Sequence, residues 1–287
     1  MRVARSLAEL ERRPRAVALG TFDGLHVGHR AVIAELVSAG LVPTVLTFHP
    51  HPREVLGYEV QLLASLERRL ELLAALEVDE TLVVEFTPEL AALEPAVFAR
   101  SYVEGIGAEL VVAAESFRFG SGRRGDLGLL ERLGLRTRVV PLVAGVSSSR
   151  IRQLVLAGEV REAAALLGRP VEVEGTVVSG DARGGTLGFP TANLRADRSL
   201  LVPGFGIYAG EALGHRAAVS IGVNPHYGGD ERRIEAFLLD FESDLYGQRI
   251  VVELWERLRA EAAFGSEAEL VAQIARDVEA ARAATRP

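Results

Sequence analysis

Short apolar runs alternate with helical patterns along the first half of the chain. Residues 15–22 (RAVALGTF) predict a buried strand, and residues 27–39 predict the helix that follows it. Alternation of this kind predicts a parallel sheet with helices on both faces, and such sheets bind ligands at the carboxyl ends of their strands. The other strands expected here are 42–48, 81–86, 109–114 and 136–142, and the other helices are 65–77, 127–133 and one that begins at Pro88.

The pattern changes near residue 168. Two short helical patterns within 147–167 are separated by Gly158, and a Gly-Arg-Pro sequence at 168–170 ends them. Residues 171–178 (VEVEGTVV) then alternate apolar and polar positions, as a half-exposed antiparallel strand does. Further strands are expected at 217–223, 233–241 and 249–255, with Gly- and Pro-rich turns between them. Strands at this spacing predict a small β-barrel.

Helix caps and chain length complete the expected organisation. Ser65 and Thr87 are the expected N-caps of two helices in the first half. Residues 266–284 predict a long closing helix with Ser266 and Glu269 as a capping box. A chain of 287 residues is about two ordinary domains. We expect an α/β domain at 1–168 and a β-barrel domain with a closing helix at 169–287.

Composition excludes several kinds of chemistry. The sequence has no cysteine, which excludes disulfides, thiolate nucleophiles and cysteine-bound metals. All 32 basic residues are arginine, so phosphate chemistry must use backbone N–H groups, arginine, histidine and a metal. The net charge of −7 argues against a nucleic-acid partner. No apolar run approaches the roughly 20 residues of a membrane span, and the N-terminal segment lacks the apolar core of a signal peptide. We therefore expect a cytoplasmic protein.

The sequence GTFDGLHVGH at 20–29 lies where the first expected strand turns into the first helix. Glycines allow a tight turn there, and the N-terminus of a helix presents N–H groups to an anion. His26 and His29 are three positions apart, so both rings can face one phosphate. A turn with two surface histidines is the alternative. Paired histidines with a metal suit nucleotidyl transfer, in which charge builds up at the α-phosphorus.

The sequence SSSRIR at 147–152 is a candidate second half of this site. Its serines lie at an expected helix start, and Arg150 and Arg152 suit a leaving pyrophosphate. The alternative is an N-capped helix with exposed arginines. The histidine motif favours the phosphate interpretation.

A Gly-rich segment, 180–193, ends in Pro-Thr-Ala-Asn. Flexible glycines can fold N–H groups around phosphates. Thr191 and Asn193 offer hard oxygens on one side of an extended segment, which suits magnesium between nucleotide phosphates. A β-turn is the alternative, although it does not explain why one of only two asparagines stands here.

Glu235 lies on the alternating sequence RRIEAFLLDF, which we interpret as a strand beside the mouth of the barrel. A carboxylate there could accept a hydroxyl proton as phosphoryl transfer begins. Pattern alone favours the alternative, an outward-facing strand glutamate.

Together these motifs resemble the bacterial bifunctional riboflavin kinase/FAD synthetase family over nearly the whole chain and in the family's order. The family's nucleotidyltransferase α/β module has G-x-F-D-G-x-H-x-G-H, T-F-x-P-H-P, F-x-F-G and S-S-[TS]-x-I-R. They match residues 20–29, 47–52, 117–120 and 147–152. Its flavokinase barrel has G-F-P-T-A-N and L-D-F-x-x-D-L-Y-G, which match 188–193 and 239–247. The histidine motif is superfamily-wide, whereas the last two motifs are specific.

The resemblance implies two reactions with Mg²⁺ and ATP. Riboflavin is phosphorylated to FMN, and FMN is adenylylated to FAD with release of pyrophosphate. It implies that Glu235 is the kinase base, that Thr191 and Asn193 bind magnesium, and that His26 and His29 stabilise adenylyl transfer. The residues that it assigns to nucleotide binding are Gly20, Phe22, Asp23, Gly28, Ser147, Ser148, Arg150, Arg152, Gly180, Gly184 and Gly188. The residues that it assigns to flavin binding are Ser116, Phe117, Asn224 and Tyr227.

Five positions depart from the family pattern. Ser116 stands where the family usually has Asp or Asn, and Gly185 replaces an arginine. His226 and Tyr227 stand where the family has Thr and Phe, and Phe237 replaces a histidine. A kinase with an impaired first module, motivated by Ser116, is therefore an alternative function. A non-catalytic flavin-binding protein and a His-x-Gly-His transferase for another acceptor are two further alternatives.

Overall fold

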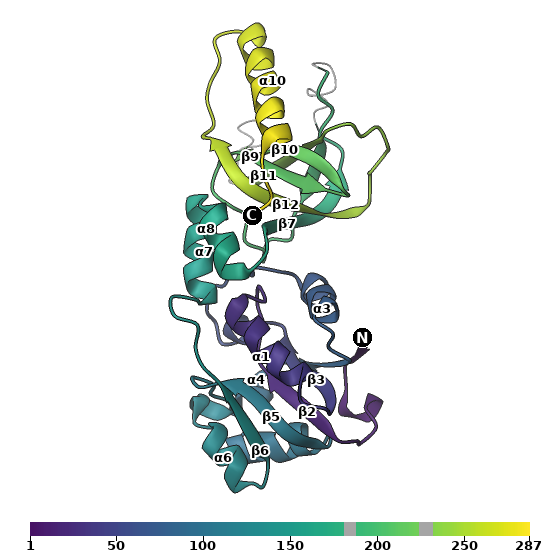
Figure 1. The fold of residues 1–287 in the computed structure, drawn as a ribbon, viewed down its shortest axis with the longest axis vertical. Coiled ribbons are helices and arrows are strands. Elements are labelled where there is room, and N and C mark those ends of the chain that lie inside the picture. The colour runs from purple at the N-terminus through teal and green to yellow at the C-terminus, as the bar shows by residue number, and fades with distance from the viewer. Residues whose placement is uncertain (181–187, 224–231) are drawn as a thin grey trace. The chain divides into compact units, whose positions relative to one another are not determined.

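The computed structural model describes residues 1–180, 188–223 and 232–287. They form two compact units, Met1–Ser148 and Ser149–Pro287, each with its own β-sheet (Figure 1). Within this part of the chain, no helix is both long and apolar enough to cross a membrane.

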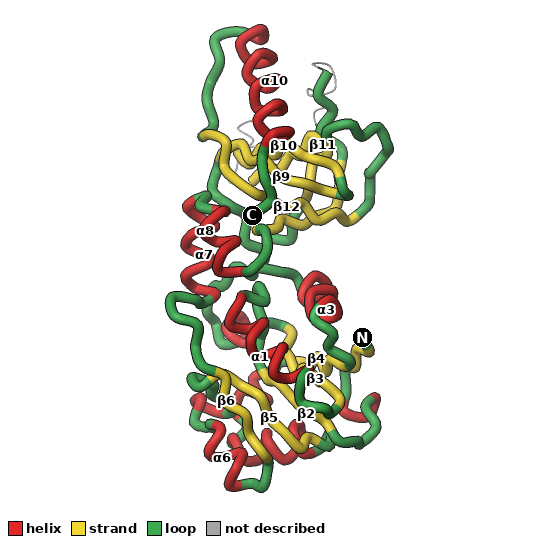
Figure 2. The backbone as a smooth tube through the Cα atoms, viewed as in Figure 1, coloured by secondary structure: helices red, strands yellow, loops and turns green. Residues whose placement is uncertain are grey.

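The first unit is built on a six-stranded parallel sheet with the order β1-β4-β3-β2-β5-β6 (Figure 2). Its strands are β1 (Arg2–Ala4), β2 (Arg15–Leu19), β3 (Val42–His49), β4 (Glu80–Glu85), β5 (Ala108–Ala114) and β6 (Arg136–Val140). Its α-helices are α1 (Val27–Val37), α2 (Pro52–Val55), α3 (Leu66–Ala75), α4 (Pro88–Ala92), α5 (Pro95–Phe98) and α6 (Leu127–Arg132). Shorter 3-10 or π-helical segments lie at Leu7–Glu9, Ala99–Glu104 and Ser121–Arg123.

Helices cover both faces of this sheet because successive residues of each buried strand point to opposite faces. On one face, Ala16 of β2 packs in a cluster with Ile33 of α1 and Leu73 of α3. On the other face, Val17 packs in a cluster with Leu130 of α6. The parallel sheet expected from the alternating pattern is therefore confirmed.

Strand β2 lies inside the sheet, with β3 on one side and β5 on the other. After β2 the chain enters α1 on one face, and the helix that follows β5, α6, lies on the opposite face. The loops after β2 and β5 therefore separate at the carboxyl edge of the sheet. Open α/β sheets bind ligands at this kind of position.

The second unit is a closed antiparallel barrel with the order β10-β11-β8-β7-β12-β9. Its strands are β7 (Val171–Val178), β8 (Ala192–Arg195), β9 (Gly206–Ala212), β10 (His215–Val223), β11 (Arg232–Leu238) and β12 (Arg249–Arg259). Helix α7 (Ser148–Ala157) leads into this unit and is followed by α8 (Val160–Leu167), while α10 (Glu267–Ala283) closes it. Helix α8 packs on β7 and β12, and α10 packs on β9 and β10. The expected barrel with its closing helix is therefore confirmed.

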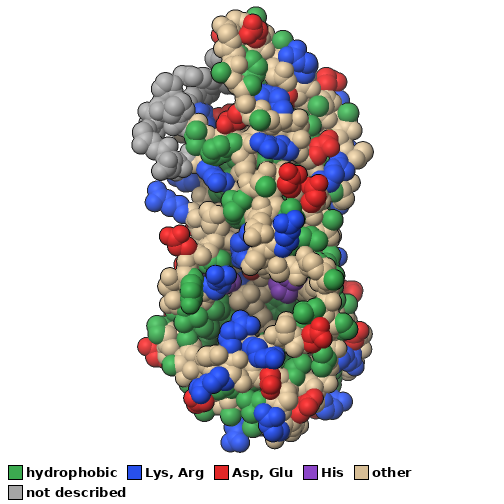
Figure 3. Space-filling view, turned by 90° about the vertical axis from the view of Figure 1, so that its left-hand side faces the viewer, with side chains coloured by type: hydrophobic (Ala, Val, Ile, Leu, Met, Phe, Trp, Pro, Cys, Tyr) green, Lys and Arg blue, Asp and Glu red, His purple; other side chains and the backbone are tan. Residues whose placement is uncertain are grey.

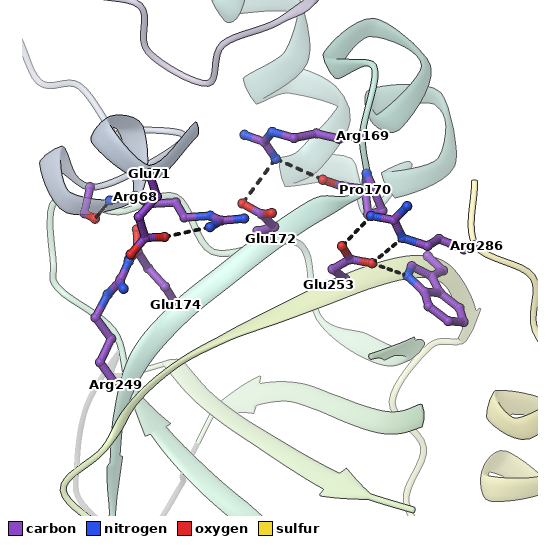
Figure 4. A network of polar contacts seen from close by, with 11 residues as sticks. Arg68, Glu71, Arg169, Pro170, Glu172, Glu174, Arg249, Glu253 and Arg286 are labelled. Carbon is purple, nitrogen blue, oxygen red and sulfur yellow. Dashed lines mark hydrogen bonds and ion pairs between the residues drawn. The ribbon is translucent and has the colours of Figure 1, made fainter. Parts of the chain in front are cut away.

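Ion pairs join neighbouring parts of the barrel (Figure 4). Arg249 of β12 pairs with Glu174 of β7 at 2.6 Å. Glu253 of β12 accepts a hydrogen bond from the indole N–H of Trp255 at 2.9 Å and pairs with Arg286 at 2.7 Å. The pair between Arg286 and Glu253 attaches the C-terminal segment to the barrel.

Several strands end or begin at other residues than the pattern predicts. Strand β2 ends at Leu19 rather than at residue 22, because the following loop turns into the left-handed region. Strand β6 ends at Val140 rather than at residue 142, and β12 continues past residue 255. Strand β11 ends at Leu238 rather than at residue 241, because the chain turns at Asp240, which has φ 58°.

The pattern did not predict strands β1, β8 and β9. Strands β1 and β8 have three and four residues, which is too short for a visible alternation. Strand β9 (GIYAGEA) contains glycines that a pattern assigns to turns. Tertiary packing requires one of them, because a Cβ on Gly210 would lie 1.8 Å from the carbonyl oxygen of Glu253.

The expected helix caps are confirmed. The hydroxyl of Ser65 accepts the N–H of Arg68 at 3.0 Å, and that of Thr87 accepts the N–H of Leu90 at 3.2 Å. The hydroxyl of Ser266 accepts the N–H of Glu269 at 3.3 Å. The carboxylate of Glu269 accepts the N–H of Gly265 at 3.0 Å, one residue before the donor that a capping box uses.

The loop after β2 needs a glycine at position 24. Phe22, Gly24 and Leu25 all have positive φ, and that of Gly24 is 78°. A Cβ on Gly24 would also lie 2.7 Å from Cδ1 of Leu63. By contrast, Gly40 has φ 69° but open space around the same position.

We expect Gly24→Ala to lower the free energy of unfolding by about 2–4 kcal/mol, because backbone strain and overpacking add. Gly40→Ala, the matched control, has the strain without the crowding and should cost about 1 kcal/mol. Urea unfolding followed by far-UV circular dichroism measures both variants. Equal losses would show that Leu63 does not crowd the loop.

Candidate active sites

Buried polar groups fix the backbone of the loop at 20–29 through hydrogen bonds. The side chain of Asp23 is buried, and its Oδ1 accepts the N–H of Leu63 at 2.9 Å. Buried Arg69 of α3 donates to the carbonyl oxygen of Thr21 at 2.5 Å and to that of Phe48 at 3.1 Å. One guanidinium therefore ties the loop after β2 to the end of β3.

Arg69 was missing from the residues that the sequence singled out. It lies four positions before buried Leu73, so a charged residue occupies the apolar side of an amphipathic helix. A charged residue on the apolar side of this helix was therefore the sequence signal that could have identified Arg69. Burial lowers the pKa of Arg69, and the carboxylate of Asp23 acts in the opposite direction.

The two histidines of the loop lie together. Their rings stack with centroids 3.6 Å apart and planes 13° apart, and Phe22 meets the ring of His29 edge-on at 5.3 Å. His26 is the N-cap of α1, and its Nδ1 accepts the N–H of His29 at 3.2 Å. A ring that accepts at Nδ1 carries its proton on Nε2, so Nε2–H of His26 is the donor left for a ligand.

The free site keeps both rings neutral. Burial lowers the pKa of His26. Burial, followed by repulsion from His26, holds the pKa of His29 well below its ordinary value of 6.5. Nδ1 of His29 is buried and has no hydrogen-bond partner among the described residues. A bound anion would stabilise the charged form of these rings, so anion binding and proton uptake are coupled.

Gly20 and Gly28 lie close to the rings of this loop. A Cβ on Gly20 would lie 3.3 Å from the ring of Phe22, and one on Gly28 would lie 3.2 Å from the ring of His26. These distances are tight, so small residues at both positions let the aromatic rings approach the backbone.

Two other predicted segments contact the loop at 20–29. Thr47, at the end of β3, donates its hydroxyl to the carbonyl oxygen of Thr21 at 3.3 Å. Ser148 donates its hydroxyl to the carbonyl oxygen of Asp23 at 3.1 Å, and Ser147 precedes it. The structure therefore brings the start of the 147–152 motif to the histidine loop. Arg150 and Arg152 lie on α7 in the second unit.

Ser116 and Phe117 follow β5, the neighbour of β2 in the sheet. Ser116 is exposed, while Phe117 is half-buried and stacks on Phe119 with centroids 5.6 Å apart. An exposed hydroxyl beside an aromatic pair at the carboxyl edge is suited to a planar, polar ligand.

The barrel brings Asn193 and Glu235 together. Strands β8 and β11 pair in a register that sets Asn193 opposite Glu235, and Nδ2 of Asn193 donates to the carbonyl oxygen of Thr191 at 3.4 Å. Gly180 lies against the carboxamide, since a Cβ there would come within 2.3 Å of Nδ2 of Asn193. Arg233 forms an ion pair with Glu235. Sequence reasoning missed Arg233, which lies two positions from Glu235 and so shares its face of the strand.

A cavity of about 330 Å³ lies beside this cluster. Thr191 lines it together with Ala236, Leu238 and the segment 241–246 of the second specific motif. Glu235 alternates with Ala236 along β11, so its side chain lies on the other face of the strand. The described lining thus includes Thr191 but not Asn193 or Glu235, and Glu235 lies beside the cavity rather than in it.

Of the remaining predicted residues, one lies in the part of the chain that the structure describes and three lie outside it. Gly188 is exposed and has φ 87°, which favours glycine. Gly184, Asn224 and Tyr227 lie outside the described residues. Phe237, a departure from the family pattern, meets Phe189 edge-on at 5.5 Å.

We expect the imidazole of His29 to titrate below 6.5 in the free protein, because its burial opposes the charge. Addition of pyrophosphate should raise the midpoint. Two-dimensional ¹H–¹⁵N NMR measures it, and His26→Gln assigns the signals. A midpoint at or above 6.5 without ligand would contradict the neutral pair.

The same shift affects stability. Because the pKa of His29 is lower in the folded state than in the unfolded chain, its contribution to the free energy of unfolding is complete above pH 6.5. This contribution is lost as the pH falls toward the folded-state pKa. His29→Gln should therefore flatten the decrease in the free energy of unfolding as the pH falls below 6.5. Urea denaturation at several pH values tests this, and unchanged curves would count against it.

Comparison with known proteins matches two sequence models to the chain, one in each half. The sequence model of FAD synthetase matches residues 8–150, and that of riboflavin kinase matches residues 167–285. A crystal structure described as a macrolide-efflux protein from Streptococcus pneumoniae has a TM-score of 0.89 and 30% identity, with 99% of each chain covered.

Full-length relatives have the same pair of activities in their names. A bifunctional riboflavin kinase/FMN adenylyltransferase from Listeria monocytogenes is 36% identical over 94% of this chain and 92% of its own. The protein of that name from Escherichia coli K12 is 35% identical over 98% and 97%. With two matched domains, an open parallel sheet and a closed barrel, the chain belongs to the bifunctional riboflavin kinase/FMN adenylyltransferase family.

Proposed function

We propose that this enzyme makes FMN in its barrel and FAD at its parallel sheet, with a separate set of residues for each step. The observation that carries the proposal is that each unit has its own cluster of the chemistry that its step needs. The stacked histidine pair lies in the first unit, and Asn193 opposite Glu235 lies in the second. We also propose 168/169 as the functional boundary, between α8 and β7.

In the adenylyl step, a phosphate oxygen of FMN attacks the α-phosphorus of ATP. The new P–O bond forms as the bond to pyrophosphate breaks, and pyrophosphate leaves. The attacking oxygen is already an anion, so the step needs no general base. Nε2–H of His26 donates to a phosphate oxygen, and His29 beside it takes up charge as the anion binds.

The other nucleotide residues of this unit shape the cradle. They are Gly20, Phe22, Asp23, Gly28, Ser147 and Ser148, and Arg150 and Arg152 hold the leaving pyrophosphate. Ser116 and Phe117 receive the flavin of FMN. The support for this assignment is that the residues from the first unit lie at, or next to, the carboxyl edge of its sheet.

In the kinase step, Glu235 accepts the proton of a riboflavin hydroxyl. The hydroxyl oxygen then bonds to the γ-phosphorus of ATP, and ADP leaves with the electrons of the broken P–O bond. Gly180, Gly184 and Gly188 bind the phosphates of ATP, and Asn224 and Tyr227 bind the flavin. Thr191 lines the cavity, which supports placing the substrate there.

Magnesium fits the oxygen donors of this cluster. The hydroxyl of Thr191 and Oδ1 of Asn193 are hard ligands, and no group of three or more His, Cys, Asp or Glu side chains in the described ranges forms an alternative metal site. Mg²⁺ prefers few protein ligands when phosphates and water supply the rest. When bound, it neutralises charge on the phosphates of ATP.

We further propose a cytoplasmic enzyme whose partners are riboflavin, FMN and ATP. The absence of cysteine fits a reducing compartment. Arginine and acidic side chains are interspersed over the face in Figure 3, and a net charge of −7 opposes binding to nucleic acid.

A time course with riboflavin, ATP and magnesium tests the proposed sequence of steps. We expect FMN first and FAD second, separated by liquid chromatography. Accumulation that stops at FMN would favour the alternative, a kinase with an impaired first unit. Ser116 is exposed and uncharged where the family has Asp or Asn, so Ser116→Asn would then be expected to restore FAD formation.

Two substitutions test the separation of the sites. Asn193→Ala should reduce FMN formation by about 100-fold or more and leave FAD formation from supplied FMN unchanged. His29→Ala should do the reverse, because it removes charge stabilisation at the sheet. Both activities are measured on the same preparations, so each is the folding control for the other. Loss of both from one folded variant would refute the assignment.

A further inference from the structure

Arg233 connects the two polar groups that the kinase proposal uses. It lies on β11 two positions before Glu235 and forms an ion pair with that carboxylate. Its Nε and Nη2 each lie 3.4 Å from Oδ1 of Asn193 and donate to it. One guanidinium therefore bridges two neighbouring strands at the point where Asn193 stands opposite Glu235.

The guanidinium of Arg233 contacts both groups through separate directions of its planar set of N–H donors, which a single ammonium charge would not provide. A guanidinium has several N–H donors in one plane, so it can hold a carboxylate and a carboxamide oxygen at the same time. The side chains of Arg233 and Glu235 are 30% and 26% exposed, so the pair is partly withdrawn from water. This partial burial strengthens the attraction relative to a fully exposed pair.

The contacts to Asn193 are longer than the usual 2.9–3.0 Å of an N–H···O bond, so they are weak. Oδ1 of Asn193 is also the oxygen that the kinase proposal gives to magnesium. Two cations cannot share that oxygen at close range without strong repulsion. The guanidinium must therefore leave the carboxamide when a metal ion arrives, while its pairing with Glu235 need not change.

We propose that Arg233 is a positioning residue of the kinase site, which rests on the proposed function of Asn193 and Glu235. It orients the carboxylate of Glu235 beside Asn193, and it occupies the carboxamide oxygen until a divalent cation replaces it. Two effects of opposite direction follow. Arg233 favours turnover through Glu235, and it weakens binding of the metal through Asn193.

The test uses the full-length chain with Arg233→Met, which keeps much of the aliphatic stem and removes the charge. Binding of Mn²⁺ in the presence of ADP is followed by electron paramagnetic resonance. The Mn²⁺ that Asn193→Ala no longer binds identifies the barrel site. We expect Arg233→Met to bind this Mn²⁺ about fivefold more tightly, because a competing cation is gone.

The same variant should lose activity as its metal affinity rises. We expect kcat of riboflavin phosphorylation to fall about tenfold or more, with KM for riboflavin within about twofold, because Glu235 loses its orientation. Arg233→Lys keeps the charge without the fork, so it should restore weak metal binding and only part of kcat. FAD formation from supplied FMN reports that the chain is folded.

Arg232→Met is the matched control. Arg232 is the neighbouring residue on β11, and it donates to the carbonyl oxygens of Val202 and Pro203 instead. Its removal changes the net charge by the same amount, so it should change neither the Mn²⁺ affinity nor kcat as Arg233→Met does. Equal effects of the two variants would show that the loss of one positive charge, and not the contacts of Arg233, causes them. This result would overturn the proposal.

The outcomes distinguish a failure of the positioning role of Arg233 from a failure of the proposed kinase site. If Asn193→Ala leaves both Mn²⁺ binding and FMN formation intact, the proposed kinase site itself is wrong. If Asn193→Ala abolishes both but Arg233→Met changes neither metal affinity nor kcat, the kinase site stands and the positioning role is overturned. A joint fall in metal affinity and kcat would indicate a merely structural role for Arg233.

Discussion

The register between β8 and β11 sets Asn193 opposite Glu235, the two residues of the proposed kinase site. A shift by one residue would turn each side chain to the other face of its strand. Barrel closure protects this register, since every strand has two partners. Arg233 then reaches both polar groups from one strand, and Gly180 leaves room for the carboxamide. The cluster of the proposed kinase site is thus a consequence of backbone pairing that no single side chain could supply.

In the first unit, the candidate site residues are brought together by loops rather than by strand pairing. Its parallel strands deliver four loops to one edge, and the loops are then fixed by buried polar contacts. Arg69 and Asp23 hold the backbone of the histidine loop, and the strained residues around Gly24 make its path specific. Burial lowers the pKa of both histidines and so favours their neutral form in the free protein. A site of this kind is organised before substrate binds, which limits the reorganisation that the reaction itself requires.

Much of the fold was predictable from the sequence, because long buried strands and capped helices have strong local signals. The parallel sheet, the barrel, the closing helix and the caps at Ser65, Thr87 and Ser266 are of this kind. The site motifs were also visible, since they stand at strand ends and the family pattern covers nearly the whole chain. Short strands and strands with glycines were not predictable. Strand β9 exists because its neighbours pair with it, although Gly206 and Gly210 look like turn residues.

Local pattern by itself therefore determined which residue types stand at the ends of strands and which segments are apolar enough to be buried. Only the tertiary structure decided which of those residues meet. The stacking of His26 on His29, the hold of Arg69 on two loops and the bridge from Arg233 to Asn193 join groups whose distance depends on packing. The side of β11 on which Glu235 lies relative to the cavity was decided in the same way. The reason is physical: periodicity reports one strand or helix at a time, whereas strand register and burial depend on the elements that pack against it.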